Sequence, residues 1–291
     1  MPISINFRNR LFPVLEKIAA HFSTPFHIYD EIGIRSTGQR LKNAFAEVRS
    51  FKEFYAVKAL PNPEILRIMK DMGYGFDCSS IAELVLAREA GAEPEDIMFT
   101  SNNTSVDDFA EAAKDGGCIL NLDDISLLDK VDPLPELLCF RYNPGERRTG
   151  NAIIGTPVEA KYGVSHSQIV DAFRQAKERG VKRFGLHTML ASNELNYAYM
   201  VQTTQMLLEL IETIHLQLAI DFEFINIGGG LGIPYHPGEP ALDIEALGEE
   251  VTVLLQDFAK RHGYQPALFM ESGRYMTGPH GVLVTTAINR K

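Results

Sequence analysis

The sequence predicts an α/β protein that folds as a (β/α)8 barrel of the TIM type. Three observations lead to this prediction. The chain has 291 residues, a length typical of one such barrel. Short apolar runs alternate about eight times with helical patterns, as in parallel βαβ units. Side chains capable of chemistry follow several of these runs, where a barrel gathers its site. The pattern alone leaves an open, doubly wound sheet as the alternative.

The runs that we expect to form barrel strands are separated by helical segments. They cover residues 53–57, 74–77, 96–100, 117–120, 137–142, 183–188, 222–228 and 267–271. A helix is expected over 63–72, because its apolar residues share one helical face. The next helix begins near Ser79 or Ser80, either of which can cap it with a hydroxyl group. Further helical patterns cover 106–114 and 202–214.

Strand-like runs also lie on both sides of the eight. One covers 26–29, and another covers 281–288 with no partner strand after it in the sequence. We therefore expect an N-terminal segment over 1–25 and a barrel domain over 26–280. Residues 281–291 would be the start of a truncated C-terminal β domain, of which only the first strand is present. An exposed, unpaired strand at 281–288 would favour association with other strands.

Composition excludes several classes of protein. The formal net charge of −10 disfavours nucleic acid as a partner. No window approaches the roughly 18 apolar residues of a membrane span, and the N-terminus has no apolar signal segment. We therefore expect a cytoplasmic protein with no membrane partner. The three cysteines are far apart in the sequence, so no disulfide framework and no metal site is expected.

Chemically capable residues follow the predicted strands. They are Lys58, Asp77, Arg141, His187, the run Gly228, Gly229 and Gly230, and the group Glu271, Gly273 and Arg274. Each has an ordinary structural explanation: a solvated lysine, a helix-capping aspartate, a structural arginine, a satisfied core histidine, a simple turn or a surface ion pair. Their occurrence at the same end of several strands instead favours a common site.

Two chemical expectations follow from these positions. A crowded, partly apolar surrounding would disfavour the charged form of Lys58 and activate its amine. Glycines let backbone amides approach an anion closely, and barrels often bind phosphate with the loops after strands seven and eight. Those loops hold Gly228–Gly230 and Ser272–Arg274 here, so we expect a phosphate group between them.

Sequence segments around these residues resemble those of the fold-type III decarboxylases, which use pyridoxal 5'-phosphate (PLP). The resemblance is strongest to the diaminopimelate decarboxylases and covers nearly the whole chain from residue 24. The matching segments are YAVKA at 55–59, GFDCSS at 75–80, RYNPG at 141–145, KYG at 161–163, IGGGLGIPY at 227–235 and ESGR at 271–274. The last has serine where the family's motif has proline. The resemblance implies an alanine racemase-like barrel.

Roles for individual residues follow from the resemblance. Lys58 would form the Schiff base with PLP within a segment that includes Ala56. His187 would stack on the pyridine ring, and Glu271 would pair with the ring nitrogen. Asp77 and Arg141 would support the lysine and the ring. The phosphate group would be held by Gly228, Gly229, Gly230, Ser272, Gly273 and Arg274.

The implied reaction is α-decarboxylation of an amino acid, most closely meso-diaminopimelate to L-lysine. One departure concerns the segment after the sixth strand, which reads HTMLAS over 187–192 where the family usually has H-I-G-S. We assign Ser192 to the phosphate-contacting serine of that motif. Because this loop shapes the substrate pocket, decarboxylation of arginine, ornithine, lysine or carboxynorspermidine remains an alternative.

The second departure is the absence of the family's C-terminal β domain, which carries a proton-donating cysteine and completes the partner's site in a homodimer. We expect little turnover from this chain alone and a homodimer in the full-length form. Three other readings stay open: a non-catalytic PLP-binding relative, a PLP racemase and a barrel aldolase that uses Lys58 without PLP. Racemases commonly place arginine near the ring nitrogen, so Glu271 argues against that reading.

Overall fold

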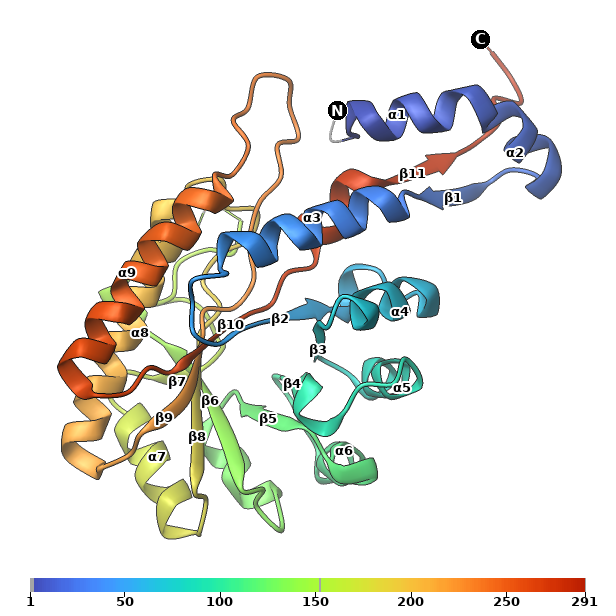
Figure 1. The fold of residues 1–291 in the computed structure, drawn as a ribbon. Helices are drawn as coiled ribbons and strands as arrows, with labels where there is room; N and C mark the ends of the chain where they lie inside the picture. The colour runs from blue at the N-terminus through green and yellow to red at the C-terminus, as the bar shows by residue number, and fades with distance from the viewer. Residues whose placement is uncertain (1–2, 152, 291) are drawn as a thin grey trace.

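A closed ring of eight parallel strands forms the centre of the molecule. The computed structural model describes residues 3–151 and 153–290. Neighbouring strands pair in the order β2-β3-β4-β5-β6-β8-β9-β10, and β10 pairs back with β2. The ring strands are β2 (Phe51–Ala56), β3 (Gly75–Cys78), β4 (Ile97–Phe99), β5 (Ile119–Leu122), β6 (Leu137–Asn143), β8 (Arg183–His187), β9 (Phe222–Asn226) and β10 (Ala267–Met270). The predicted (β/α)8 barrel is confirmed (Figure 1).

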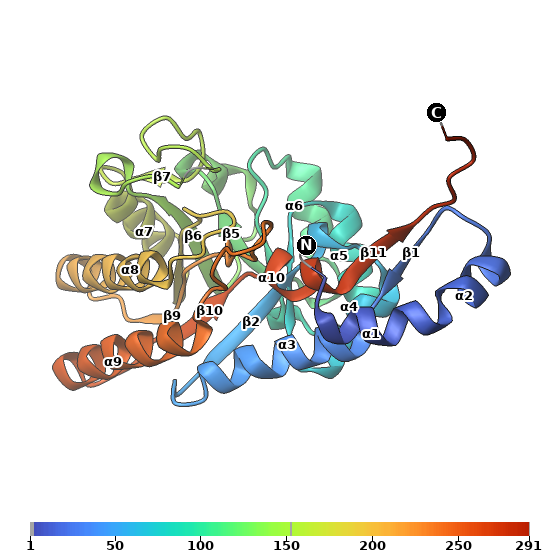
Figure 2. The same cartoon turned by 90° about the horizontal axis from the view of Figure 1, so that it is seen from above.

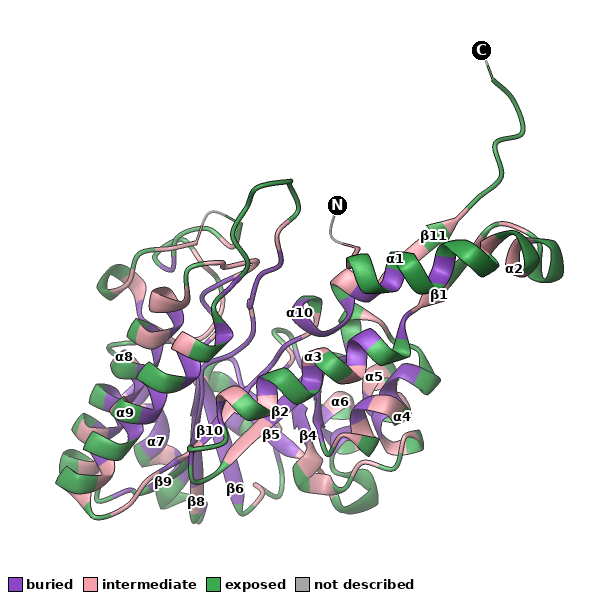
Figure 3. Cartoon of the chain, turned by 45° about the horizontal axis from the view of Figure 1, so that its top comes forward, coloured by how far each residue is buried: buried purple, intermediate pink, exposed green. Residues whose placement is uncertain are grey.

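Helices cover the outside of the ring, with their apolar faces toward the strands (Figure 3). The long helices are α3 (Glu31–Ala44), α4 (Pro63–Asp71), α5 (Ile81–Glu89), α6 (Val106–Ala112), α7 (Ile169–Glu178), α8 (Tyr197–Leu218) and α9 (Ile244–His262). β10 is followed by the short α10 (Arg274–Thr277), and β6 also pairs with the two-residue strand β7 (Val164–Ser165). Short 3-10 turns are η1 (Phe12–Val14), η2 (Val57–Ala59), η3 (Pro94–Asp96), η4 (Lys114–Gly116), η5 (Ile125–Lys130), η6 (Gly145–Arg147) and η7 (Gly278–His280). No helix of the described residues combines the length and apolarity needed to span a bilayer.

The predicted elements agree with the observed ones except at their ends. Each of the eight predicted runs overlaps one ring strand, and no strand end differs from the expected one by more than two residues; β5 is displaced by two residues at both ends. The hydroxyl group of Ser80 accepts a hydrogen bond from the amide of Glu83 and caps α5, as one of the two expected alternatives. The patterns at 63–72, 106–114 and 202–214 correspond to α4, α6 and α8.

An arm made of both chain ends projects from the barrel (Figures 1 and 2). β1 (Phe26–Tyr29) pairs antiparallel with β11 (Gly281–Val284), with α1 (Ile5–Leu11) and α2 (Leu15–Phe22) nearby. The expectation of an unpaired strand over 281–288 is therefore wrong. The strand is shorter, and its partner comes from the opposite end of the chain. β1 accordingly belongs to a separate two-stranded sheet rather than to the barrel ring.

Strand alternation explains why the site lies at one end of the ring. Successive side chains of a strand point to opposite faces, so every second residue faces the barrel interior. A small apolar cluster fills that interior: Phe54, Met98, Ile119, Leu137, Cys139 and Phe224. On every ring strand that contributes to this cluster except β2, which has Ala56, the next inward position toward the carboxyl end is polar. The polar residues at this level are Thr100, Asn121, Arg141, His187, Asn226 and Glu271. The polar layer therefore lies directly above an apolar plug.

Candidate active site

An open pocket of about 510 Å³ lies at the carboxyl ends of the ring strands. Ten of the residues predicted from the sequence line it together: Ala56, Lys58, Asp77, Arg141, His187, Ser192, Gly230, Glu271, Gly273 and Arg274. The other three, Gly228, Gly229 and Ser272, are buried behind the lining. The structure thus brings predicted residues from six ring strands and their loops to one cavity.

Lys58 lies in the short turn η2, directly after β2. Its Nζ atom is 2.6 Å from Asp77 Oδ2 and 3.5 Å from Ser79 Oγ. The Lys58 side chain is 56% exposed, whereas that of Asp77 is 3% exposed. Asp77 comes from the neighbouring strand β3, and its contact with Lys58 excludes the alternative that it only caps a helix.

The ion pair changes the pKa of both partners. Burial lowers the pKa of Lys58, but the attraction and hydrogen bond of Asp77 outweigh this, and the pKa is raised. The expectation that the charged form of Lys58 is disfavoured is therefore wrong, because the sequence does not show the carboxylate beside it. Burial raises the pKa of Asp77 to about 6, with repulsion from Glu271 acting in the same direction and Lys58 opposing it.

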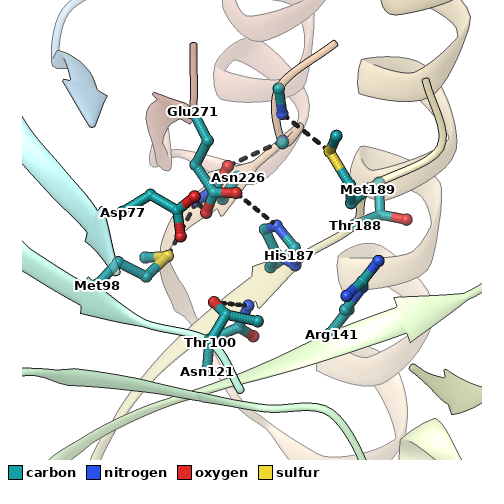
Figure 4. A network of polar contacts seen from close by, with 12 residues as sticks. Asp77, Met98, Thr100, Asn121, Arg141, His187, Thr188, Met189, Asn226 and Glu271 are labelled. Atoms are coloured by element: carbon teal, nitrogen blue, oxygen red, sulfur yellow. Dashed lines mark hydrogen bonds and ion pairs between the residues drawn. The ribbon is translucent and has the colours of Figure 1, made fainter. Parts of the chain in front are cut away.

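A buried carboxyl group, that of Glu271, is held by side chains from β8 and β9 (Figure 4). Glu271 Oε2 lies 3.2 Å from His187 Nε2, and Glu271 Oε1 accepts a hydrogen bond from Asn226 Nδ2 at 2.8 Å. Burial raises the pKa of Glu271, but His187 above all, together with Lys58 and Asn226, outweighs this, and the pKa is lowered. Glu271 is therefore a carboxylate. His187 Nδ1 is buried without a hydrogen-bond partner among the described residues.

Arg141 supports the pocket from β6. Its Nη1 atom donates to Asn102 Oδ1 at 3.2 Å and lies 3.4 Å from Asp123 Oδ1. The guanidinium group also lies over the ring of Tyr162, 5.0 Å from its centroid. Side chains from three different loops thus hold one cation at the pocket wall.

The glycine run after β9 is closely packed, not open. The amide of Gly228 donates to Asn226 Oδ1 at 2.9 Å, and the amide of Gly229 contacts Met189 Sδ at 3.2 Å. Gly230 has a φ of +99°, and a Cβ atom there would lie 2.4 Å from the carbonyl oxygen of Ala191. Only glycine fits this position. Gly230 is also the member of the run that lines the pocket.

The loop after β10 places a second small residue beside the lysine. A Cβ atom on Gly273 would lie 2.6 Å from Ala59 Cβ and 3.2 Å from Ala56 Cβ. Arg274 Nη1 donates to the hydroxyl group of Tyr235 at 2.7 Å. Since Arg274 binds Tyr235 and Glu271 is buried, the alternative of a surface ion pair between them is excluded.

The sequence reasoning missed nine of the residues that line the pocket, and most of them come from loops, where strand-end counting gives no signal. They are Ala59, Ser79, Thr100, Ser101, Asn102, Tyr162, Met189, Asn193 and Leu231. It also missed Asn226, which holds Glu271 from behind the lining and could have been found as a polar residue at the end of β9. Ser192, assigned from the resemblance, lines the pocket, and its amide donates to Asn151 Oδ1 at 3.2 Å.

Comparisons with known proteins agree with this geometry. The family model for the pyridoxal-binding domain of pyridoxal-dependent decarboxylases matches residues 33–278. Protein TabA of Pseudomonas amygdali pv. tabaci is 42% identical over 290 residues, which is 100% of this chain and 68% of that protein. Diaminopimelate decarboxylase of Methanothermobacter thermautotrophicus is 34% identical, over 92% of this chain and 64% of the relative.

A solved structure shows the same architecture. Diaminopimelate decarboxylase from Helicobacter pylori, complexed with L-lysine, superposes with a TM-score of 0.82 at 26% identity, covering 92% of this chain and 68% of that one. The chain thus spans about two thirds of the length of these relatives. With the family model matching most of its length, the chain belongs to the pyridoxal-dependent decarboxylases, as their pyridoxal-binding domain, and PLP is the cofactor of that family.

Proposed function

We propose that this chain forms the PLP-binding part of an α-decarboxylase for a diamino acid, with Lys58 as the residue that holds the cofactor. One observation carries the proposal. A lysine paired with a buried carboxylate shares a pocket of about 510 Å³ with a second buried carboxylate, which is held by His187 and Asn226. A simple structural role would not require either buried carboxylate to face a cavity.

The residues of the pocket fit the chemical groups of PLP. Lys58 offers an amine to its aldehyde. At Gly230 and Gly273 a side chain would collide with the backbone or with Ala59, so both loops expose bare backbone that a phosphate group can approach. The guanidinium group of Arg274 supplies a positive charge beside them. His187 lies on the inner wall, where its ring can contact the pyridine ring.

Each polar residue then has a defined task. Glu271, held as a carboxylate by His187 and Asn226, favours a proton on the ring nitrogen. Asp77 keeps Lys58 at the pocket wall through their 2.6 Å contact. PLP, when bound, withdraws the electron pair that remains on the α-carbon after carbon dioxide leaves. The protein contributes orientation and charge.

For the substrate, meso-diaminopimelate, with L-lysine as product, is our first candidate. The diaminopimelate decarboxylases among the relatives support it. A second candidate is another amino acid, because the segment at 187–192 departs from the family's pattern and because the 42% identical relative is named Protein TabA. The full-length protein would act as a homodimer in the cytoplasm.

The test compares substrates on one PLP-loaded preparation of the full-length protein. Meso-diaminopimelate, L-lysine, L-ornithine, L-arginine and carboxynorspermidine are added separately, and carbon dioxide release is measured together with the change in visible absorbance. We expect both signals with meso-diaminopimelate, and L-lysine as the product. Release from another member of the panel alone would shift the proposal to that substrate. A change in absorbance without release from any of the five would contradict the decarboxylase function.

A further inference from the structure

A buried carboxyl group lies directly behind the pocket and is not used by the function described so far. Glu53 is on β2, and its residue is 1% exposed. Because strand residues alternate, Glu53 faces the helical layer together with Tyr55, whereas Phe54 faces the barrel interior. Burying an acidic side chain among apolar residues is costly unless the group is hydrogen-bonded or neutral. Its presence there requires an explanation.

Glu53 binds the backbone of the loop after β10. The amide of Ser272 donates to Glu53 Oε1 at 2.5 Å, and the carbonyl oxygen of Ser272 accepts from the amide of Ala56 at 3.3 Å. Both polar backbone groups of Ser272 are therefore tied to β2, the strand that leads to Lys58. Ser272 itself is 1% exposed, so water cannot replace either bond.

Ser272 connects the two parts of the loop that face the pocket. Before it comes Glu271, and after it come Gly273 and Arg274. The backbone at Gly273 packs closely against the turn that holds Lys58, since a Cβ atom there would lie 2.6 Å from Ala59 Cβ. We therefore expect a change at the Ser272 amide to move the residues that we assign to the phosphate group.

We propose that Glu53 is a positioning residue that fixes the phosphate-binding loop 272–274 by accepting the hydrogen bond of the Ser272 amide. The inference rests on the proposed role of Gly273 and Arg274 in binding the PLP phosphate. Glu53 does not touch the pocket and acts only through Ser272.

The protonation of Glu53 supports this role. Burial raises the pKa of Glu53 to about 8, with Glu271 and Asp77 acting in the same direction and the hydrogen bonds from Ser272 opposing them. At neutral pH the group is mostly an uncharged acid. Its second oxygen, Oε2, has no hydrogen-bond partner among the described residues and can carry the proton. A neutral Glu53 can still accept the hydrogen bond from the loop. It adds no negative charge to those of Asp77 and Glu271 near a phosphate dianion.

The test is a double-mutant cycle read out as ligand affinity. Glu53→Leu removes the acceptor, Ser272→Pro removes the donor because proline has no amide hydrogen, and the double variant removes both. Dissociation constants are measured by fluorescence titration with PLP and with pyridoxal, which lacks the phosphate group. Glu53→Gln, which keeps a neutral carbonyl acceptor, is the matched control.

We expect Glu53→Leu to weaken PLP binding by about tenfold, because a buried amide is left without a partner. Pyridoxal affinity should change less than about twofold, because the loop holds only the phosphate. Glu53→Gln should retain PLP affinity, and the double variant should recover most of it, so that the two single effects are not additive.

Several results would overturn the inference. These are unchanged PLP affinity in Glu53→Leu, equal losses for PLP and pyridoxal, or additive effects in the cycle. If Glu53→Leu cannot be purified, Glu53→Met takes its place in the cycle. A wild-type protein that binds pyridoxal and PLP equally would overturn the phosphate site itself. A wild-type protein that binds neither would overturn the proposed function, and this inference with it.

Discussion

The two walls of the pocket place a carboxylate beside a base in different ways. On the β2–β3 wall, Asp77 is buried but Lys58 is 56% exposed. On the β8–β10 wall, His187 and Glu271 are both buried, with side chains 1% and 7% exposed. The first wall therefore presents a reactive group that can move into the pocket. The second is a fixed platform whose charges are set by neighbours on three strands.

This difference has a physical cause. Lys58 follows the end of β2 in a short turn, so its backbone is anchored while its side chain extends into open space. His187 and Asn226 end their strands, and Glu271 directly follows β10. Their inward positions lie immediately above the apolar plug. The position of Lys58 in the turn after its strand thus leaves its side chain free to move. The inward positions of the other three residues hold their side chains rigidly.

The largest expected effect concerns the reactive wall. In the full-length protein, Lys58→Ala should abolish the visible absorbance of bound PLP and reduce decarboxylation to background, because no other amine lines the pocket among the described residues. Lys70→Ala is the matched control, since Lys70 pairs with Asp96 outside the pocket at 2.6 Å. Equal loss in both variants would contradict the assignment.

A smaller effect is expected on the fixed wall. Glu271→Gln removes the negative charge beside His187 while keeping the shape of the side chain. We expect kcat to fall by about 10²-fold, with PLP still bound, because the charge acts on the chemical step. Stopped-flow absorbance and steady-state kinetics measure the two quantities separately. If Glu271→Gln instead lost PLP binding while the fraction still loaded with PLP kept its kcat, Glu271 would act on binding and not on the chemical step.

The ion pair on the reactive wall can be tested by its pH dependence. Asp77 raises the pKa of Lys58, so Asp77→Asn should leave more uncharged amine at a given pH. The rate of covalent PLP capture should then reach its half-maximum at a lower pH than in the wild type. Asp96→Asn, which alters the ion pairs with Lys52 and Lys70, should leave the profile in place.

The smallest expected effect is on stability. The folded-state pKa of Glu53 is about 8, against an ordinary value of 4.5. Its contribution to stability is therefore fully present below about pH 4.5 and is lost as the pH rises through about 8. Glu53→Gln carries no titrating group, so its Tm relative to wild type should rise by about 5 °C between pH 5 and pH 9. The exposed Glu89→Gln control should show no such trend.

Sequence patterns predicted the barrel and most of the pocket because both depend on local signals. Apolar runs of strand length define the ring, and polar residues at strand ends define the site. The pairing of β1 with β11 could not be predicted in this way, because the two strands are separated by the whole barrel.

The errors within the site have the same origin. The sequence shows Lys58 after an apolar strand, but the carboxylate that raises its pKa comes from the next strand in space. Glu53 reads as an ordinary residue near the beginning of a strand. Only the packing of the loop at Ser272 against β2 shows that it is buried and hydrogen-bonded.

The most direct test of the account is to locate the covalent attachment site of PLP. Protein loaded with PLP is reduced with borohydride, digested and analysed by mass spectrometry. We predict a single pyridoxyl adduct, on the peptide that contains Lys58, and no adduct in Lys58→Ala. An adduct mainly on another lysine, or no adduct in protein shown to bind PLP, would contradict the central claim.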